Sequence, residues 1–156
     1  MPKAGFWAVG GYEISFRRDG HWYADEERIE NRRIELLFSR CIRRDLREGR
    51  EGQWMVDVGI DRQPVRVEDT PLVVTSVDGD RDRGFTIRTN DGVEEPLDCS
   101  TLEVGDGEVL YCSVDRGERG RLRTRFLRPA YYRLVRDIEL ENDRPILHAA
   151  GRTYPL

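Results

Sequence analysis

The segment DGDRDRG, residues 78–84, has the aspartate spacing of a calcium-binding loop. Asp78, Asp80 and Asp82 stand at the first, third and fifth positions of such a loop. The loop also needs glycine at its sixth position and glutamate at its twelfth, but this chain has Arg83 and Thr89 there. The segment therefore predicts a solvated hairpin loop, and we expect no metal from it.

The chain lacks the common motifs of catalysis. Its two histidines, His21 and His148, have no HxxxH or HExxH spacing, so they do not indicate a metal centre. His148 could act as a general base with Asp69 or Asp98, although its alternating apolar neighbours favour a half-buried structural role. No GxSxG, P-loop or GxGxxG sequence occurs. We therefore lean against an enzyme and expect no catalytic residue, metal or cofactor.

Three polar residues near the middle of the chain could contact a ligand. Arg66 and Asp69 flank the end of PVRVED, where the arginine could hold an anion through two hydrogen bonds while the carboxylate accepts a ribose hydroxyl. The alternative is an arginine–aspartate pair that fixes the junction between two lobes. Asn90 precedes an Asp-Gly turn, where it could contact a ligand or bond its own backbone, as asparagine commonly does in turns.

The preferred position for a phosphate is the start of a helix near residue 129. Arg128 precedes Pro129, and a helix N-terminus offers unpaired N–H groups and partial positive charge. Tyr131 belongs to the apolar stripe of this helix, so Tyr132 is the better polar contact. Gly151 would allow a ligand to approach the backbone closely, although a plain tight turn explains it equally well.

Charge and composition argue against nucleic acid as a partner. The 156 residues carry a net charge of −4, and 25 of the 26 basic residues are arginine. The segment IENRRIELLFSRCIRRDL looks basic, but over residues 25–51 eight arginines are matched by eight acidic residues. Mixed charges at helical spacing describe a solvated helix face with local ion pairs. We therefore expect no nucleic acid and no membrane partner.

The cysteines and the start of the chain favour a cytoplasmic protein. Cys41, Cys99 and Cys112 are an odd number without CxxC spacing, so we expect reduced, mostly buried thiols. No apolar run approaches the length of a membrane span, and the opening residues lack the pattern of an export signal.

Elements in the first half follow from local patterns. Asp19-Gly20 predicts a two-residue hairpin turn between residues 14–16 and 21–23. A helix is expected from an N-cap at Asn31 to near the glycines of residues 46–52. Its apolar stripe is Ile34, Leu37, Phe38, Cys41 and Ile42. Strands are expected in residues 53–60, 64–69 and 70–77, with Pro64 and Pro71 at edges or strand starts.

The second half shows the same alternation. A hairpin is expected around Asp91-Gly92, and residues 108–114 should pair with residues 121–127. A second helix starts at Pro129 and runs through AYYRLVRDIELE to residue 141, with Ile138 on its apolar face, and two short strands follow around Gly151. The order strand, helix, strands around residues 22–68 recurs around residues 121–156. We therefore expect an α+β fold of two related lobes, residues 1–70 and 71–156, with antiparallel sheets each covered by one helix.

The chain resembles the bacterial family called domain of unknown function 1285 (DUF1285). The resemblance covers about nine tenths of the chain and rests on DGHWYADEERI, VRVEDTPLVV, FTIRTNDG, LRPAYYRLV and the terminal GRTYPL in that order. It implies a duplicated α+β core, a second lobe similar to pleckstrin-homology barrels and a ligand cleft between the lobes. It also implies a nucleotide-like ligand and a role in signal transduction.

Two functional hypotheses follow. The first is a non-catalytic module that binds a small anionic or nucleotide-like ligand between the lobes and transmits a signal by changing the lobe contact. The second is a protein-interaction adaptor without a small ligand, which uses its charged helices or open sheet edges. The sequence does not indicate the oligomeric state.

Overall fold

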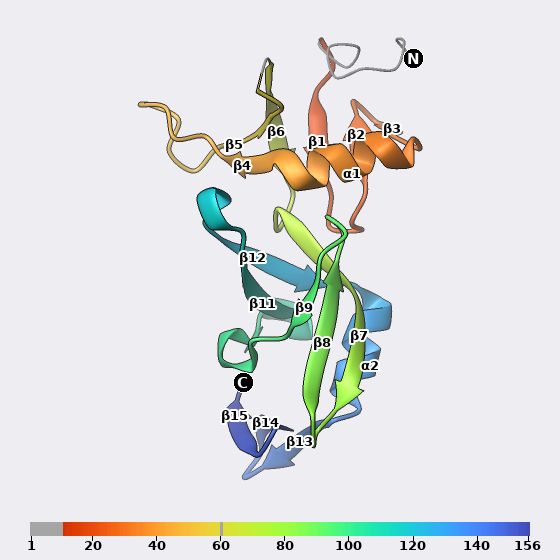
Figure 1. The fold of residues 1–156 in the computed structure, drawn as a ribbon, viewed down its shortest axis with the longest axis vertical. Coiled ribbons are helices and arrows are strands. Elements are labelled where there is room, and N and C mark those ends of the chain that lie inside the picture. The colour runs from red at the N-terminus through yellow and green to blue at the C-terminus, as the bar shows by residue number, and fades with distance from the viewer. Residues whose placement is uncertain (1–10, 60) are drawn as a thin grey trace.

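The computed structural model describes residues 11–59 and 61–156, whose strands form three sheets (Figure 1). Sheet A and helix α1 make the first lobe, and sheet B, helix α2 and a small sheet C make the second. The start of the chain, where no export signal was expected, and Ile60 lie outside the described residues. In the part that is described, no helix is long and apolar enough to cross a membrane.

Sheet A has the strand order β3-β2-β1-β6-β5-β4. Its strands are β1 (Ile14–Phe16), β2 (Trp22–Ala24), β3 (Glu27–Arg28), β4 (Ile42–Arg44), β5 (Trp54–Asp57) and β6 (Arg62–Val67). The hairpin predicted at Asp19-Gly20 is confirmed, because β1 and β2 pair antiparallel. The loop has three residues rather than two, since the Arg17 N–H donates to the His21 carbonyl and Gly20 takes a φ of 85°.

Helix α1 (Arg32–Cys41) lies across sheet A beside the junction of the two lobes (Figure 1). The predicted N-cap is confirmed, because the Asn31 side chain accepts hydrogen bonds from two backbone N–H groups of the first turn. Phe38 is fully buried and packs edge-on against Trp22 of β2. The predicted end of the helix is wrong: Ile42 leaves it to pair with Val56 in sheet A, so a strand replaces the last helical turns.

The predicted apolar stripe of α1 is only partly correct. Phe38 and Ile42 are buried and Ile34 and Cys41 are half-buried, but Leu37 is 40% exposed.

Sheet B has the strand order β10-β11-β12-β7-β8-β9. Its strands are β7 (Leu72–Asp80), β8 (Gly84–Thr89), β9 (Glu94–Pro96), β10 (Glu103–Val104), β11 (Leu110–Asp115) and β12 (Arg121–Phe126). The predicted hairpins are confirmed: β8 pairs with β9 around Asp91-Gly92, and β11 pairs with β12. Three short 3-10 helices lie in its loops: η2 (Cys99–Thr101), η3 (Asp106–Glu108) and η4 (Gly117–Arg119).

The two lobes share one strand topology. In each sheet two three-stranded antiparallel ribbons join through their first and last strands, β1 with β6 and β7 with β12. Both of these pairs are parallel, so the prediction of purely antiparallel sheets is wrong. The proposed correspondence between the two helices is also wrong, because α1 connects β3 to β4 whereas α2 follows β12. The segment that occupies the place of α1 in the second lobe includes η2.

Helix α2 (Arg128–Val135) packs against β7 and has proline at the predicted start. It ends earlier than predicted, because Ile138 belongs to β13 (Ile138–Glu141) and pairs with Leu147. With β14 (Arg144–Ala149) and β15 (Arg152–Pro155) this strand forms sheet C. The two short strands expected around Gly151 are therefore confirmed.

The predicted strand position is confirmed for one of the two prolines and wrong for the other. Pro71 directly precedes β7, as expected of a strand start. Pro64 lies inside β6, a central strand that begins at Arg62, so the prediction of an edge or a strand start is wrong there. It is tolerated because the pairing of β6 with β1 begins only at Val65, one residue later. Sheets A and B are separated along the chain between Val67 and Leu72, close to the predicted division at residue 70, and the division into two domains stays a prediction.

Candidate functional site

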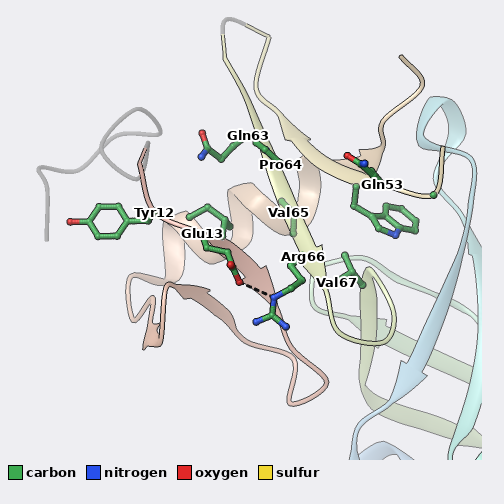
Figure 2. Close-up of a pocket in the computed structure, with 11 residues that line it drawn as sticks. Tyr12, Glu13, Gln53, Gln63, Pro64, Val65, Arg66 and Val67 are labelled. Carbon is green, nitrogen blue, oxygen red and sulfur yellow. Dashed lines mark hydrogen bonds and ion pairs between the residues drawn. The ribbon is translucent and has the colours of Figure 1, made fainter. Parts of the chain in front are cut away.

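A groove of about 480 Å³ lies on the first lobe over β6 (Figure 2). We call it the sheet A groove. It is lined by Tyr12, Glu13, Ile14, Gly52, Gln53, Trp54, Gln63, Pro64, Val65, Arg66 and Val67. Of the candidate residues from the sequence it contains only Arg66. It belongs entirely to the first lobe, so it is not the expected cleft between lobes.

Arg66 and Asp69 do not pair with each other. Arg66 Nε donates to Glu13 Oε1 at 2.8 Å, and this hydrogen bond raises the pKa of the guanidinium. Asp69 Oδ2 instead accepts from the Tyr111 hydroxyl at 2.8 Å and from Arg125 Nη1 at 2.7 Å. Burial, followed by the hydrogen bond to Asp69, raises the pKa of Tyr111. The two candidates therefore belong to different lobes and different sets of contacts.

Asn90 joins the two lobes. Its Oδ1 accepts from the Val73 backbone N–H at 2.9 Å, and its Nδ2 donates to Ser39 Oγ in α1 at 2.8 Å. Ser39 Oγ also accepts from the indole N–H of Trp22 at 2.9 Å. The side chain therefore joins the lobes rather than bonding its own turn, and the ligand role of Asn90 stays a prediction.

Asp91 is the centre of a buried charged cluster. Its side chain is fully buried, and Arg116 Nε and Arg119 Nη2 lie 2.7 Å and 3.2 Å from Oδ2. The Thr89 hydroxyl donates to Oδ1. Burial by itself opposes ionisation, but hydrogen bonds from Arg116 and Thr89 and the charges of both arginines outweigh it and lower the pKa of Asp91. We call Asp91, Arg116, Arg119 and Thr89 the Asp91 cluster.

The Asp91 cluster also forms hydrogen bonds with the first lobe. Arg119 Nη1 donates to the Ser39 and Ile42 carbonyl oxygens at 3.0 Å and 3.2 Å, at the end of α1. Arg40 Nε donates in return to the Asp91 carbonyl oxygen at 3.3 Å. At the junction, an arginine of each lobe therefore donates hydrogen bonds to backbone carbonyl oxygens of the other lobe.

A pocket of about 180 Å³ lies between the lobes, next to this cluster. We call it the inter-lobe pocket. Its lining residues come from β4 and the segment after it, and from η4 and the start of β12: Arg43, Arg44, Leu46, Glu118, Arg119, Gly120 and Arg121. Four arginines thus face one glutamate. Arg44 also lies over the Trp54 ring, with its Cζ 4.8 Å from the ring centroid. The arrangement favours an anion.

Arg128 and Tyr132 line one pocket of about 240 Å³ at the start of α2. The N-cap residue Leu127 makes no side-chain hydrogen bond, so the helix N-terminus has no side-chain cap. Tyr131 is half-buried and packs on the core, as expected, whereas Tyr132 is 62% exposed. The structure thus brings these two candidates together in the second lobe, away from Arg66.

The remaining candidates, Gly151 and His148, belong to sheet C and its turn, and the ligand role of Gly151 stays a prediction. Gly151 forms a tight turn with Ala150 between β14 and β15 at a φ of 79°, which glycine adopts readily. His148 lies near Thr153 and Glu139 rather than near Asp69 or Asp98, the partners considered for a general base. Within residues 11–59 and 61–156, no group of three or more histidine, cysteine or acidic side chains could hold a metal ion.

The sequence analysis missed the arginines of the lobe junction. The segment DRGERG was interpreted only as the loop between two strands, yet it supplies Arg116 and Arg119 to the Asp91 cluster. The sequence did contain a signal for this role: Arg116 and Arg119 are each followed by glycine, and a short loop between two strands does not require two long charged side chains. Arg43 and Arg44 were counted only in a solvated helix face.

No protein-family model and no curated protein matches the chain. Two crystal structures have a similar fold. A DUF1285 family protein from Silicibacter pomeroyi is 21% identical with a TM-score of 0.67, and the match covers 93% of this chain and 79% of that one. A DUF1285 family protein from Shewanella baltica is 18% identical with a TM-score of 0.60, and the match covers 81% of this chain and 92% of that one. At this identity the likeness shows a shared fold. Both of these structures are of DUF1285 family proteins, the family that the sequence motifs resemble.

Proposed function

We infer that the chain is a member of the DUF1285 family, and we propose that it is a non-catalytic module that binds a small anionic, nucleotide-like ligand between its lobes. The observation that carries the proposal is the inter-lobe pocket, where four arginines face a single glutamate in a chain whose net charge is −4. Guanidinium groups form bidentate, charge-assisted hydrogen bonds with phosphate oxygens.

The volume of the inter-lobe pocket limits how much of a nucleotide it can enclose. Pockets that enclose a whole drug-sized ligand usually have about 300–1,000 Å³, and this one has about 180 Å³. The phosphate groups would therefore occupy the pocket, and the nucleoside would lie outside it along β4 and η4.

A signal-transduction role follows from the position of Arg119. This residue lines the pocket and also binds the Ser39 and Ile42 carbonyls of the first lobe and Asp91 of the second. A phosphate that binds Arg119 would compete for the hydrogen bonds that this side chain makes to Ser39, Ile42 and Asp91. Occupancy of the pocket would therefore change the contact between the lobes. A cytoplasmic location is part of this proposal, and the three free cysteines support it.

We also propose that the second lobe is related to pleckstrin-homology barrels and that the two lobes arose by duplication. The shared strand order of sheets A and B supports the duplication. The six strands of sheet B followed directly by α2 support the pleckstrin-homology relation.

The test is thermal unfolding with pyrophosphate, ADP and adenosine. A ligand that binds only the folded state at a hundred times its Kd stabilises by about 2.7 kcal/mol, and each kcal/mol shifts the midpoint by about 2–4 °C for a chain of this size. We expect pyrophosphate and ADP to raise the midpoint and adenosine to leave it unchanged.

Variants locate the site. Arg43→Gln and Arg121→Gln should reduce the shift, whereas Arg152→Gln in sheet C, an exposed arginine at the far end of the molecule, should preserve it (Figure 1). If Arg128→Ala alone abolishes the shift, the phosphate binds at the start of α2 instead.

A protein-interaction adaptor is the second candidate. Large apolar side chains are exposed on both lobes, with Leu46 at 76% and Leu140 at 73%. An adaptor would show no shift with any of the three small molecules, and that outcome would favour it over the ligand-binding module.

A further inference from the structure

The sheet A groove holds an arginine whose terminal nitrogens are available. Arg66 Nε is fixed on Glu13 Oε1 at 2.8 Å, and Figure 2 shows the two side chains pointing toward one another. Neither Nη group of Arg66 makes a hydrogen bond to another residue within 11–59 or 61–156. A guanidinium held through Nε still presents two parallel N–H donors at its end, the geometry that matches a carboxylate.

The charge of the groove selects a monoanion. Arg66 and Glu13 are its two charged lining residues, so their charges cancel. A phosphate dianion at Arg66 would also be repelled by the adjacent Glu13 carboxylate, whereas a single negative charge meets less repulsion and fits the planar fork. This differs from the inter-lobe pocket, where arginines outnumber the single acid.

The rest of the lining is suited to an apolar body with a few polar groups. Pro64 is exposed and Val67 half-buried, so both contribute apolar surface, and Trp54 adds an indole, whereas Val65 is 7% exposed and packs in the core. Gln53 and Gln63 lie on opposite sides of β6 (Figure 2) and can hydrogen-bond polar substituents. A volume of about 480 Å³ is within the usual range for a small organic ligand.

We propose that the sheet A groove is a second binding site, which takes a small organic monocarboxylate: the carboxylate pairs with the free end of Arg66 and the apolar body lies over β6 toward Trp54. The site shares no lining residue with the inter-lobe pocket. Arg44 of that pocket lies over the Trp54 ring, so the Arg66 variants, rather than the Trp54 signal alone, assign a response to the groove.

Titration followed by tryptophan fluorescence tests the proposal. The ligands are butanoate, hexanoate and octanoate, and octanamide is the uncharged analogue of octanoate. Trp54 lines the groove while Trp22 is buried in the core, and Trp54→Phe identifies the responding indole. We expect affinity to rise along the series by up to about fourfold per buried methylene. Octanamide should bind at least about tenfold more weakly than octanoate, because it lacks the charge-assisted pair.

Variants of one strand supply the controls. Arg66→Gln and Arg66→Lys should each weaken octanoate by about tenfold or more, since lysine keeps the charge but not the fork. Arg62→Gln, an exposed arginine of β6 outside the groove, should bind as the parent does. Both positions are about half exposed, so their variants should fold. Equal binding of octanoate and octanamide, an unaffected Arg66→Gln, or no response to octanoate at millimolar concentration would overturn the proposal.

Discussion

The substitution Asp91→Asn would remove the central charge of the lobe junction with little change of shape. The Asp91 side chain is fully buried, and Arg116, its nearest charged partner, is 8% exposed. Asparagine suits the Asn-Gly turn that results, so the hairpin should persist. Removing one partner of a buried ion pair typically costs about 3–5 kcal/mol, because the remaining charge stays buried without compensation. Arg116 keeps a second partner, Glu95, 2.8 Å from its Nη1, so we expect the lower end of this range, about 3 kcal/mol. At about 2–4 °C per kcal/mol, the midpoint should fall by about 6–12 °C.

The neighbouring ion pair between Arg88 and Glu94 provides a matched control. Its N–O distance is also 2.7 Å, but the side chains are 56% and 54% exposed. Glu94→Gln should therefore cost no more than about 1 kcal/mol. Thermal and urea unfolding of both variants measure the difference. A loss in Asp91→Asn within about 1 kcal/mol of the loss in Glu94→Gln would refute the view that burial makes the Asp91 cluster important.

The same variant predicts a dependence on pH. The pKa of Asp91 is lowered in the folded protein, so its stabilising contribution is complete above the unfolded pKa, about 3.9. The contribution is lost as the pH falls through the lower folded pKa. The stability difference between parent and Asp91→Asn should therefore be constant from about pH 5 to pH 8 and shrink in stronger acid.

Three further substitutions or reactions test other parts of the structure. Asn90→Ala should cost about 1–3 kcal/mol in unfolding experiments, because it leaves the Val73 backbone N–H without its partner and removes one of two donors to the Ser39 hydroxyl; an unchanged midpoint would contradict the contact. Gly79→Ala should prevent the β7–β8 hairpin from forming as it is, since φ is 101° and the new Cβ would lie 2.2 Å from a facing carbonyl oxygen; a parent-like thermal midpoint would be evidence against it. A thiol reagent at pH 8 should label half-exposed Cys41 first, because burial raises the pKa of Cys99 to about 11 and of Cys112 to about 12; equal rates for all three thiols in the folded protein would refute this order.

Local features of the fold could be predicted from short stretches of sequence. The Asp-Gly turns at residues 19–20 and 91–92 were predicted because glycine readily adopts the positive φ that each loop requires. Asn31 and Pro129 marked the helix starts for reasons that involve only the first turn. Helix ends were predicted less well. Ile42 and Ile138 continue the helical spacing, yet both pair with strands, because sheet pairing gives their backbone groups partners that a local pattern does not reveal.

The candidate sites depended on contacts between distant residues. The sequence determined which side chains carry charge and that the chain holds many arginines with few lysines. It could not decide their partners: Arg66 bonds Glu13, 53 residues away, and Asp69 bonds Arg125, 56 residues away. Arg119 reaches the Ser39 carbonyl across 80 residues. The first two pairs form when strands distant in the sequence pair, β1 with β6 and β7 with β12. The Arg119 contact forms only after the two sheets meet, since burial at the junction, rather than spacing along the chain, sets which charges must be neutralised there.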